Sequence, residues 1–306
     1  MRSSVIAALL TLATPVVVVA WGGLGHRTVG YLAEKHLTDE AKSLFDTLLA
    51  NDQGFDYSDA AVWADAIKQR MPWTRPLHFI NPVNDNPPKK CDVVWPTDCP
   101  DEGCVVSATF NYTSILLNTD SDLEDRKNAT MFVMHLIGDI HQPLHASGWE
   151  RGGNDFKPIC WKHSPPSGDD HCTGSINLHE IWDKHILHKL RGLPISLDKS
   201  REKAAAAQWA DDLFGRQQAA AIYASSECTR LNNEKCILQW TTASNKLVCS
   251  NVLKRGLKWM AENDLSEEYF DDNWEVVDDQ IGKAGLRLGA WMNAIAAATS
   301  GRNRDL

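Results

Sequence analysis

The chain has 306 residues, of which 43% are hydrophobic, and its formal net charge is −9 at pH 7. That length fits one large domain or two small ones, and no low-complexity linker, repeat or sharp shift in composition divides the sequence. The acidic charge excludes binding of nucleic acid through bulk neutralisation of phosphates. A phosphate-handling role would therefore need a local positive charge, such as bound divalent cations.

Residues 1–20 have the features of a signal peptide. Arg2 gives an early positive charge, residues 5–19 form an apolar run, and Ala20 offers a small residue for cleavage. Polar residues and a proline interrupt the run, which disfavours a retained anchor helix, and no other segment is apolar enough to span a bilayer. We therefore expect residues 21–306 to form a single domain that is secreted to the extracellular space and has no membrane partner.

Helical periodicity dominates the sequence after residue 20, and strand signals are weak. Thr38 and Ser58 stand where helix N-caps belong, because acidic residues follow each of them. The Pro- and Asn-rich stretch 78–103 is predicted to be an irregular loop, and residues 91–95 and 154–161 could form a small hairpin at most. These features predict an all-α, single-domain helical bundle with long loops pinned by disulfides. The predicted helices are, in chain order, His26–Leu37, Thr38–Ala50, Ser58–Arg70, Val105–Leu117, Leu123–Ile140, Ile176–Leu190, Ser200–Ser225, Leu238–Asn263 and Val276–Thr299.

Eight cysteines and two glycosylation sequons are typical of an exported protein. All eight cysteines lie beyond residue 20, and their even number indicates four disulfides, whereas no CxxC pair suggests thiolate-bound zinc. The sequons at Asn111 and Asn128 predict glycosylation at the surface. The pairing below follows from proximity and is one of 105 connectivities. The local pairs are Cys99–Cys104, Cys160–Cys172 and Cys228–Cys236, which leaves Cys91–Cys249.

Histidine and aspartate recur at i, i+4 spacing in two predicted helices. His135 and Asp139 share one face of a helix whose neighbouring residues are apolar, which places them against or inside a core. Taken alone, such a pair is more often a hydrogen-bonded unit than a metal site. His179 and Asp183 repeat the spacing, and His145 follows the first pair. This recurrence favours metal binding, and imidazole and carboxylate donors without thiolate suit Zn²⁺.

Removal of the signal peptide would create a further ligand. Trp21 would become the first residue, and His26 follows after Gly-Gly-Leu-Gly. A free α-amine, a backbone carbonyl and an imidazole would then lie within a few residues of one another. A free amine is a rare metal ligand that only processing can create.

In this order and at this spacing, the motifs resemble those of the S1/P1 family of secreted, zinc-dependent nucleases that prefer single strands. The resemblance covers essentially all of residues 21–306, and it depends on six motifs together, since any one would be weak. Cys91, Cys99, Cys104 and Cys249 also fall where such proteins place disulfides. The motifs are WGGLGH (21–26), WADAIK (63–68), LHFIN (77–81), HLIGDIHQPLH (135–145), GGN (152–154) and NLHEIWD (177–183).

The resemblance implies three zinc ions, two of them close together. Asp139 would bridge the close pair, and two dications beside it would keep it ionised. The implied ligands are Asp65, His78, His135 and Asp139 for the first ion, the Trp21 amine and carbonyl, His26 and Asp139 for the second, and His145, His179 and Asp183 for the third.

The resemblance also implies a reaction. The protein would act as an endonuclease on single-stranded DNA and RNA, leave 5′-phosphate products, and remove phosphate from 3′-mononucleotides, using water activated by the close zinc pair. Asp65 would orient that water. Lys68 would offer positive charge to the transition state, although without the resemblance it reads as a solvated helix residue. Phe79 would stack on an unpaired base, although alone it reads as an ordinary core aromatic.

Three further residues are implied in substrate binding. Asn81 stands where fungal members often carry Asp, and base preference should change because an amide donates as well as accepts hydrogen bonds. Asn154 could reach a base edge or the backbone of the strand. Arg151 could stack on a base or meet a phosphate.

Two other hypotheses remain open from the sequence. A bacterial-type zinc phospholipase C resembles the same scaffold and also starts with Trp, but it tends to carry Glu where this chain has Asp183. A non-catalytic, zinc-stabilised secreted protein is the other, and the complete ligand set together with Lys68 argues against it. As a nuclease, the protein is expected to be a monomer.

Overall fold

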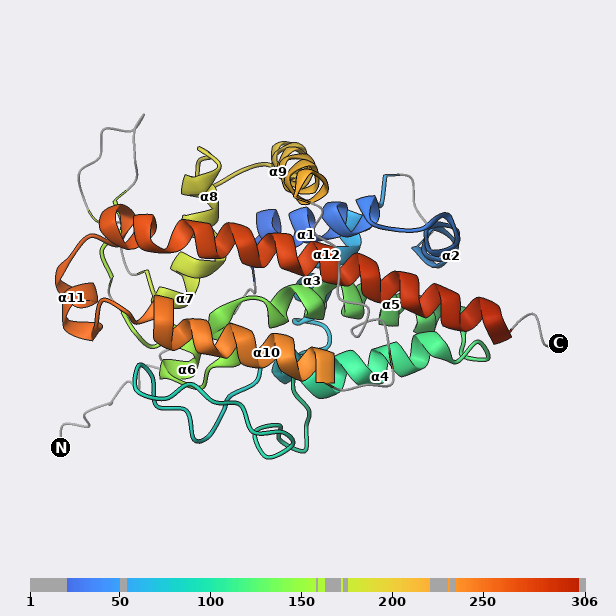
Figure 1. Ribbon diagram of the computed structural model, residues 1–306, viewed down its shortest axis with the longest axis horizontal. Helices are drawn as coiled ribbons and strands as arrows, with labels where there is room; N and C mark the ends of the chain where they lie inside the picture. The colour runs from blue at the N-terminus through green and yellow to red at the C-terminus, as the bar shows by residue number, and fades with distance from the viewer. Residues whose placement is uncertain are drawn as a thin grey trace, which may run out of the picture.

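The computed structural model describes residues 21–49, 54–157, 159–162, 172, 176–220, 231 and 235–302. This part of the chain is helical, as predicted, and contains no β-strand, only three isolated bridges (Figure 1). The predicted hairpin between residues 91–95 and 154–161 is therefore wrong. Cys160 instead pairs with the segment before α12, where its carbonyl accepts the Leu265 N–H at 2.9 Å.

Most predicted helices are present, and α4 and α5 begin and end as predicted. The helix predicted for residues 238–263 is interrupted, because Gly256 has φ +79°, a left-handed conformation that ends one helix and precedes the next. The elements are α1 (Gly23–Lys35), α2 (Asp39–Leu49), α3 (Tyr57–Ile67), η1 (Pro72–His78), α4 (Val105–Leu117), α5 (Leu123–Ile140), η2 (Pro143–Ala146), α6 (Glu150–Gly153), α7 (Leu178–Glu180), η3 (Ile181–His185), α8 (Ile186–Leu190), α9 (Lys199–Ala219), α10 (Lys235–Leu247), η5 (Val248–Val252), α11 (Leu257–Glu262), η6 (Leu265–Tyr269) and α12 (Phe270–Arg302).

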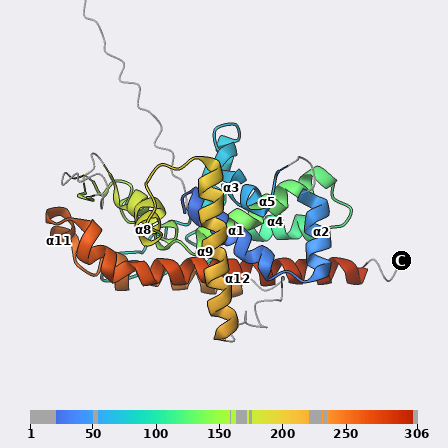
Figure 2. The ribbon, with the colours of Figure 1, turned by 90° about the horizontal axis from the view of Figure 1, so that it is seen from above.

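Helix α5 is the central element of the core. Every residue from Ala129 to Ile140 is buried, and a helix that is enclosed on all sides can bury a polar pair only among protein atoms. Helices α3 and α4 pack against it, and α1 packs against α3, α9 and α12. The long helix α12 runs along the molecule (Figure 1), and α9 lies across it (Figure 2). The C-terminal half of α5 is thus surrounded by elements from both ends of the chain.

The two predicted N-caps have different outcomes. Thr38 Oγ1 accepts the Ala41 N–H at 3.2 Å, so Thr38 caps α2 as predicted. Ser58 is not the cap of α3. Asp56 takes that position, and its carboxylate accepts the Asp59 N–H at 3.1 Å, because a charged acceptor suits the positive end of a helix.

Disulfides tie the loops to the helices. Three predicted pairs are confirmed, namely Cys91–Cys249, Cys99–Cys104 and Cys160–Cys172. Cys236 is also disulfide-bonded, and its predicted partner, Cys228, lies outside the described residues. The bond between Cys91 and Cys249 joins positions 158 residues apart, and closing so long a loop stabilises the fold by about 5 kcal/mol in the chain-entropy account.

Both sequons lie on helices: Asn111 is exposed on α4, and Asn128 is half-buried on α5. Within the described residues, no helix combines the length and the apolar composition needed to cross a bilayer.

A buried ion-pair network joins α1, α3 and α9. Arg27 donates to Asp59 and to Glu202, each at 2.9 Å. Asp59 also accepts from Lys199 at 2.9 Å and from Lys203 at 3.0 Å. Burial alone would raise the pKa of Asp59, but the hydrogen bonds from Arg27 and the two lysines outweigh it and hold that pKa below its usual range. The network fixes the position of α1, which carries His26 next to Arg27.

We expect Asp59→Asn to lower the free energy of unfolding by about 3 kcal/mol near neutral pH, because Arg27 then stays buried beside an uncharged amide. A carboxyl group whose pKa is lower in the folded than in the unfolded state stabilises the fold above its unfolded pKa, and this stabilisation is lost as the pH falls. The difference between wild type and variant should narrow below about pH 4. Urea denaturation on both sides of that pH measures it.

Asp279→Asn is the matched control, since Asp279 is an exposed carboxylate that pairs with Lys283 within one helix. Its loss should change the free energy of unfolding by about 0.5 kcal/mol or less. Equal effects of the two substitutions would contradict a stabilising role of the Arg27 network.

Candidate metal centre

Three elements bring ligands to the buried face of α5. His135 and Asp139 project from α5 one turn apart and are fully buried. Asp65 comes from the last turn of α3, His78 is the last residue of η1, and His26 lies in the first turn of α1. We call these five residues the Asp139 cluster. The sequence-predicted residues of the first ion, together with His26, are therefore neighbours in the fold.

The Asp139 carboxylate lies among three imidazoles. His26 Nε2 is 3.2 Å from Asp139 Oδ1. On the other oxygen, His78 Nδ1 is 2.9 Å and His135 Nε2 is 3.4 Å from Asp139 Oδ2. The rings of His26 and His135 stack with their centroids 3.8 Å apart. Such close packing of imidazoles around one carboxylate is typical of side chains that bind the same metal ion.

Asp65 contacts two of the same imidazoles. Its Oδ1 is 3.3 Å from His135 Nε2 and 3.8 Å from His78 Nδ1. The Lys68 ammonium is 2.5 Å from the same oxygen. Lys68 is only 5% exposed, so its reading as a solvated helix residue is wrong, because the helix turns it inward beside Asp65.

A second group, which we call the His179 cluster, consists of His145, His179 and Asp183. His145 Nε2 and His179 Nε2 are 3.2 Å apart, and His179 Nε2 is 3.1 Å from Asp183 Oδ2. His145 Nδ1 lies 3.9 Å from Asp139 Oδ1, so the two clusters adjoin. Gln142 donates its amide to Asp183 Oδ1 at 2.7 Å, a contact that the sequence reasoning missed although Gln142 lies within the HQPLH motif.

Backbone carbonyls fix the orientation of three of the imidazoles. In each, Nδ1–H donates to a carbonyl of another element, which leaves the Nε2 lone pair directed into the cluster. Metal-binding histidines are oriented in this way. The bonds are His135 Nδ1 to Ala61 O (2.7 Å), His145 Nδ1 to His78 O (2.7 Å) and His179 Nδ1 to Gly152 O (2.6 Å).

Unpartnered buried atoms test whether these residues fit a metal. Buried donors and acceptors without a partner are rare, because each loses its hydration without compensation. Here they concentrate in the Asp139 cluster, and all are nitrogen or carboxylate oxygen atoms, the donors that Zn²⁺ accepts. The buried atoms that make no hydrogen bond are His26 Nδ1 and Nε2, His78 Nε2, His135 Nε2 and Asp139 Oδ1. His26 Nε2 and Asp139 Oδ1 are within ion-pair distance of each other.

Three groups of three residues could each hold a metal ion, because within each group the potential ligand atoms lie within 4.8 Å of one another. Two of them overlap in the Asp139 cluster, and the third is the His179 cluster, so the geometry fits a metal centre. The groups are His26, Asp65 and His135; His78, His135 and Asp139; and His145, His179 and Asp183.

Burial also sets the charge of these ligands. It lowers the pKa of His26, His78 and His145 well below the usual value, which keeps these imidazoles neutral and able to bind a metal. It raises the pKa of Asp139 well above the usual value, because an ionised carboxylate at this depth needs a cation. Burial also opposes the charged forms of His135 and His179, but Asp139 and Asp183 respectively outweigh it and raise the pKa of these two imidazoles. The neutral imidazoles can bind a metal, and Asp139 needs a nearby cation to be ionised.

The first residue after the predicted cleavage point is buried, and the residue that follows it is hydrogen-bonded to Asp183 of the His179 cluster. Trp21 is fully buried, and the Gly22 N–H donates to the Asp183 carbonyl at 2.8 Å. A Cβ at Gly25 would lie 2.8 Å from the Trp21 Cβ, so only glycine allows Trp21 to fold back onto α1. These contacts hold the backbone of residues 21–22 against the helix that carries Asp183.

The predicted substrate residues differ in their exposure to solvent and in their partners. Phe79 is half-buried and does not belong to the described core or to the side chains packed against it, which disfavours its reading as a core aromatic. Asn81 is exposed. Asn154 is buried, and its amide donates to the Arg151 carbonyl at 2.9 Å. Arg151 is 65% exposed and pairs with Asp155 at 3.3 Å.

The GGN motif has a role that the sequence reasoning did not find. Gly152 has φ +64°, and a Cβ there would lie 2.7 Å from the Leu144 carbonyl oxygen. This approach brings the Gly152 carbonyl to His179 Nδ1. In the sequence, only the paired glycines indicate an unusual backbone at this position. They do not show that the Gly152 carbonyl orients His179.

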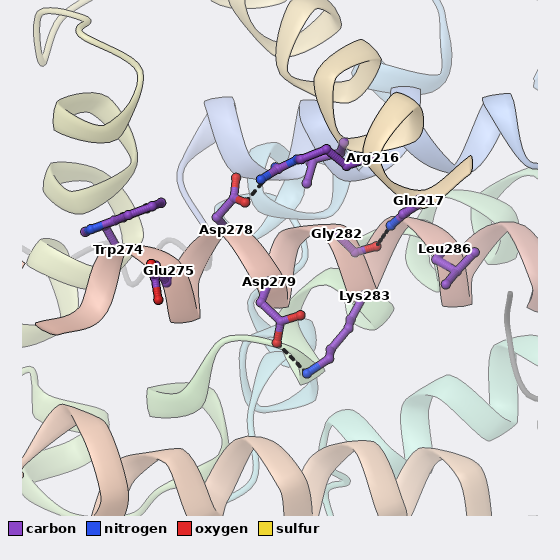
Figure 3. A pocket seen from close by; sticks show the side chains of 10 residues that line it. Arg216, Gln217, Trp274, Glu275, Asp278, Asp279, Gly282, Lys283 and Leu286 are labelled. Carbon is purple, nitrogen blue, oxygen red and sulfur yellow. Dashed lines mark hydrogen bonds and ion pairs between the residues drawn. The ribbon is translucent and has the colours of Figure 1, made fainter. Parts of the chain in front are cut away.

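A pocket of about 440 Å³ lies between α9 and α12 (Figure 3). Its charged side chains are engaged with one another: Arg216 with Asp278 at 2.6 Å, and Lys283 with Asp279. It lacks histidine, so it offers no comparable ligand set.

The described residues therefore form a helical fold that encloses two adjoining His/Asp clusters, which together make a candidate metal centre. Residues 21–297 match the family described as S1/P1 Nuclease. The chain belongs to the S1/P1 nuclease family, and the resemblance seen in the six motifs is confirmed.

Curated relatives cover nearly the whole chain. It is 35% identical to Nuclease S1 of Aspergillus oryzae (strain ATCC 42149 / RIB 40) over 298 residues, which is 95% of this chain and 96% of that protein. It is 31% identical to Nuclease P1 of Penicillium citrinum, over 90% of this chain and 97% of that protein. It is 29% identical to Endonuclease 2 of Arabidopsis thaliana, over 90% of each chain. Similarity to these nucleases makes the chain a nuclease-type hydrolase.

We expect Gly152→Ala to weaken metal binding at the His179 cluster by about tenfold to a hundredfold, because the added Cβ would displace the carbonyl that orients His179. Competition with a chromophoric zinc chelator measures the affinity. Gly192→Ala is the matched control, since Gly192 also has φ +64° but has nothing within 4 Å of an added Cβ. If both substitutions weaken binding equally, backbone strain and not the carbonyl is responsible.

Proposed function

We propose that this protein is a secreted, zinc-dependent endonuclease that hydrolyses the phosphodiester bonds of single-stranded DNA and RNA to 5′-phosphate products and also acts as a 3′-nucleotidase. The observation that carries the proposal is the set of buried imidazole and carboxylate atoms in the Asp139 cluster that make no hydrogen bond, in an S1/P1 family member. The relatives carry the names nuclease and endonuclease. Substrates would be single strands and 3′-mononucleotides, and the protein would act as a monomer.

The same proposal covers processing and export. Residues 1–20 would be removed as a signal peptide, and residues 21–306 would form one domain. The disulfides support an oxidising compartment, since such bonds persist outside the cytosol. Asn111 is exposed and suits glycosylation, and Asn128 is the second candidate.

Three zinc ions fit the donor set. When bound, they would lower the pKa of a coordinated water and neutralise charge on the phosphate. The proposed ligands are Asp65, His78, His135 and Asp139; Trp21, His26 and Asp139; and His145, His179 and Asp183.

Asp65 and Lys68 are the proposed catalytic pair. Burial alone would raise the pKa of Asp65, but His135 and Lys68 outweigh it and hold that pKa well below the usual value. The ionised carboxylate accepts a hydrogen bond from the attacking water and orients it toward phosphorus. Lys68 lies 2.5 Å from Asp65 and presents its positive charge where the transition state becomes more negative.

Phe79 explains the expected preference for single strands. Its ring is half-buried next to His78, and a base can stack on it only when that base is unpaired. Asn81, exposed two residues later, would meet the edge of the stacked base as both donor and acceptor. Asn154 would contribute its side-chain oxygen, because its amide already donates to Arg151. Arg151 would leave its exposed partner Asp155 for a phosphate at little cost.

Metal content and activity measured on one purified sample test this function. We expect about three zinc ions per chain and selective cleavage of single-stranded over duplex DNA, with 5′-phosphate ends. Cleavage of a phosphatidylcholine analogue is measured in parallel. Lipid cleavage without nucleic-acid cleavage would support a phospholipase C, and full metal loading without turnover would support a structural metal protein. Either result would overturn the proposal.

Trp21 gives a separate prediction about the second ion. One extra residue before Trp21 moves the α-amine away, so we expect the loss of about one zinc ion per chain and of most activity, with an unchanged helical circular-dichroism spectrum. The same residue added after Leu306 is the control and should change neither metal content nor activity. Equal zinc content in the two extended proteins would exclude the amine as a ligand.

A further inference from the structure

The short helix η1 exposes an aromatic side chain near the Asp139 cluster. Trp73 is 59% exposed, whereas five of the chain's other tryptophans are among its largest fully buried side chains. A single exposed hydrophobic residue is ordinary on a protein surface. Trp73 differs from an ordinary exposed hydrophobic residue in its position within η1 and in its positively charged neighbours.

The register of η1 places Trp73 in a row that precedes Phe79 in the chain. A 3₁₀ helix has three residues per turn, so side chains at i and i+3 lie above one another. Thr74 and Leu77 form one such row, and both are buried. The adjacent row contains Trp73 and Pro76, and Phe79 follows η1 directly with an extended backbone. Pro76 and Phe79 are half-buried, so exposure falls along the chain from Trp73 toward His78 and Phe79.

Positive charge accompanies the row. Residues 68–75 contain Lys68, Arg70 and Arg75 and no acidic residue, in a chain whose net charge is −9. Arg70 and Arg75 are both exposed, and Arg75 donates to Gln69 at 3.2 Å, which holds the guanidinium at the surface. An aromatic row with flanking arginines has the chemistry of a single-strand track, in which rings stack on bases and cations meet phosphates.

We propose that Trp73, Pro76, Phe79, Arg70 and Arg75 form an extended subsite that holds nucleotides of a single strand beyond the one at the cleaved bond. This inference rests on the proposed function. The five steps of 3₁₀ helix from Trp73 to His78 rise about 10 Å, the length of about three stacked nucleotides at about 3.4 Å each. Because any base has a face that stacks, the subsite discriminates by strand length and by the absence of pairing rather than by sequence.

Cleavage of substrates of increasing length tests the subsite. For Trp73→Ala we expect kcat/KM to fall about tenfold on an octanucleotide, mainly through KM, and to change less than about twofold on a 3′-mononucleotide, which reaches only Phe79. Trp73→Phe should restore most of the loss because it keeps an aromatic ring. Arg75→Ala should lower the slope of log affinity against log salt concentration by about one for a phosphorothioate octanucleotide that resists cleavage.

Leu123→Ala is the matched control. Leu123 is 64% exposed at the start of α5, about 24 Å along that helix from Asp139, so its loss should affect no substrate length. Equal losses in Trp73→Ala on mononucleotide and octanucleotide, or no loss on either, would overturn the subsite. So would a wild-type dimer that Trp73→Ala converts to monomers, since Trp73 would then contact a second copy. Failure of the wild type to cleave single strands when loaded with zinc would instead contradict the proposed function.

Discussion

The burial of the Asp139 carboxylate is the constraint on which the rest of the structure depends. It projects from α5 where every residue from Ala129 to Ile140 is buried. An ionised carboxylate without compensation costs several kcal/mol at such a depth. Burial lowers the pKa of both His26 and His78, so these two neutral imidazoles do not cancel its charge. Burial also acts against the charged form of His135, but the charges of Asp139 and Asp65 outweigh it and raise the pKa of His135. A bound cation would relieve the remaining cost, and folding and metal binding would then be coupled.

The ligand geometry depends on contacts between elements rather than within them. The carbonyl that orients His135 belongs to α3, the one that orients His145 belongs to the last residue of η1, and the one that orients His179 comes from α6. A shift of any of these elements would rotate a ring and misdirect its Nε2. The buried ion pairs of Arg27 and the long-range disulfide of Cys91 restrain such shifts. Stability of the fold and precision of the centre have the same physical origin.

The sequence predicted what local geometry determines. The i, i+4 spacing of His135 with Asp139 places both on one helical face whatever the rest of the fold does, and α5 begins and ends as predicted. Contacts between residues that are far apart in the sequence could not be predicted from local spacing. Lys68 was read as solvated but is buried, and the dependence of His179 on the Gly152 carbonyl required a left-handed glycine to approach Leu144. The hairpin was wrong because alternating residues cannot show that Cys160 pairs with the segment before α12.

The charge distribution gives a reason for selectivity. Duplex DNA bound without sequence preference is held by many phosphate contacts, and a chain with a net charge of −9 opposes them. The segment 68–75 is positive, and it lies in the sequence between the ligands Asp65 and His78. Under the proposed function, this segment would attract an anionic strand toward the Asp139 cluster. A strand would gain most from this attraction when its bases are unpaired and can stack on Trp73 and Phe79. Local positive charge in an acidic chain would thus favour strands that reach the buried centre over nucleic acid held by phosphate contacts alone.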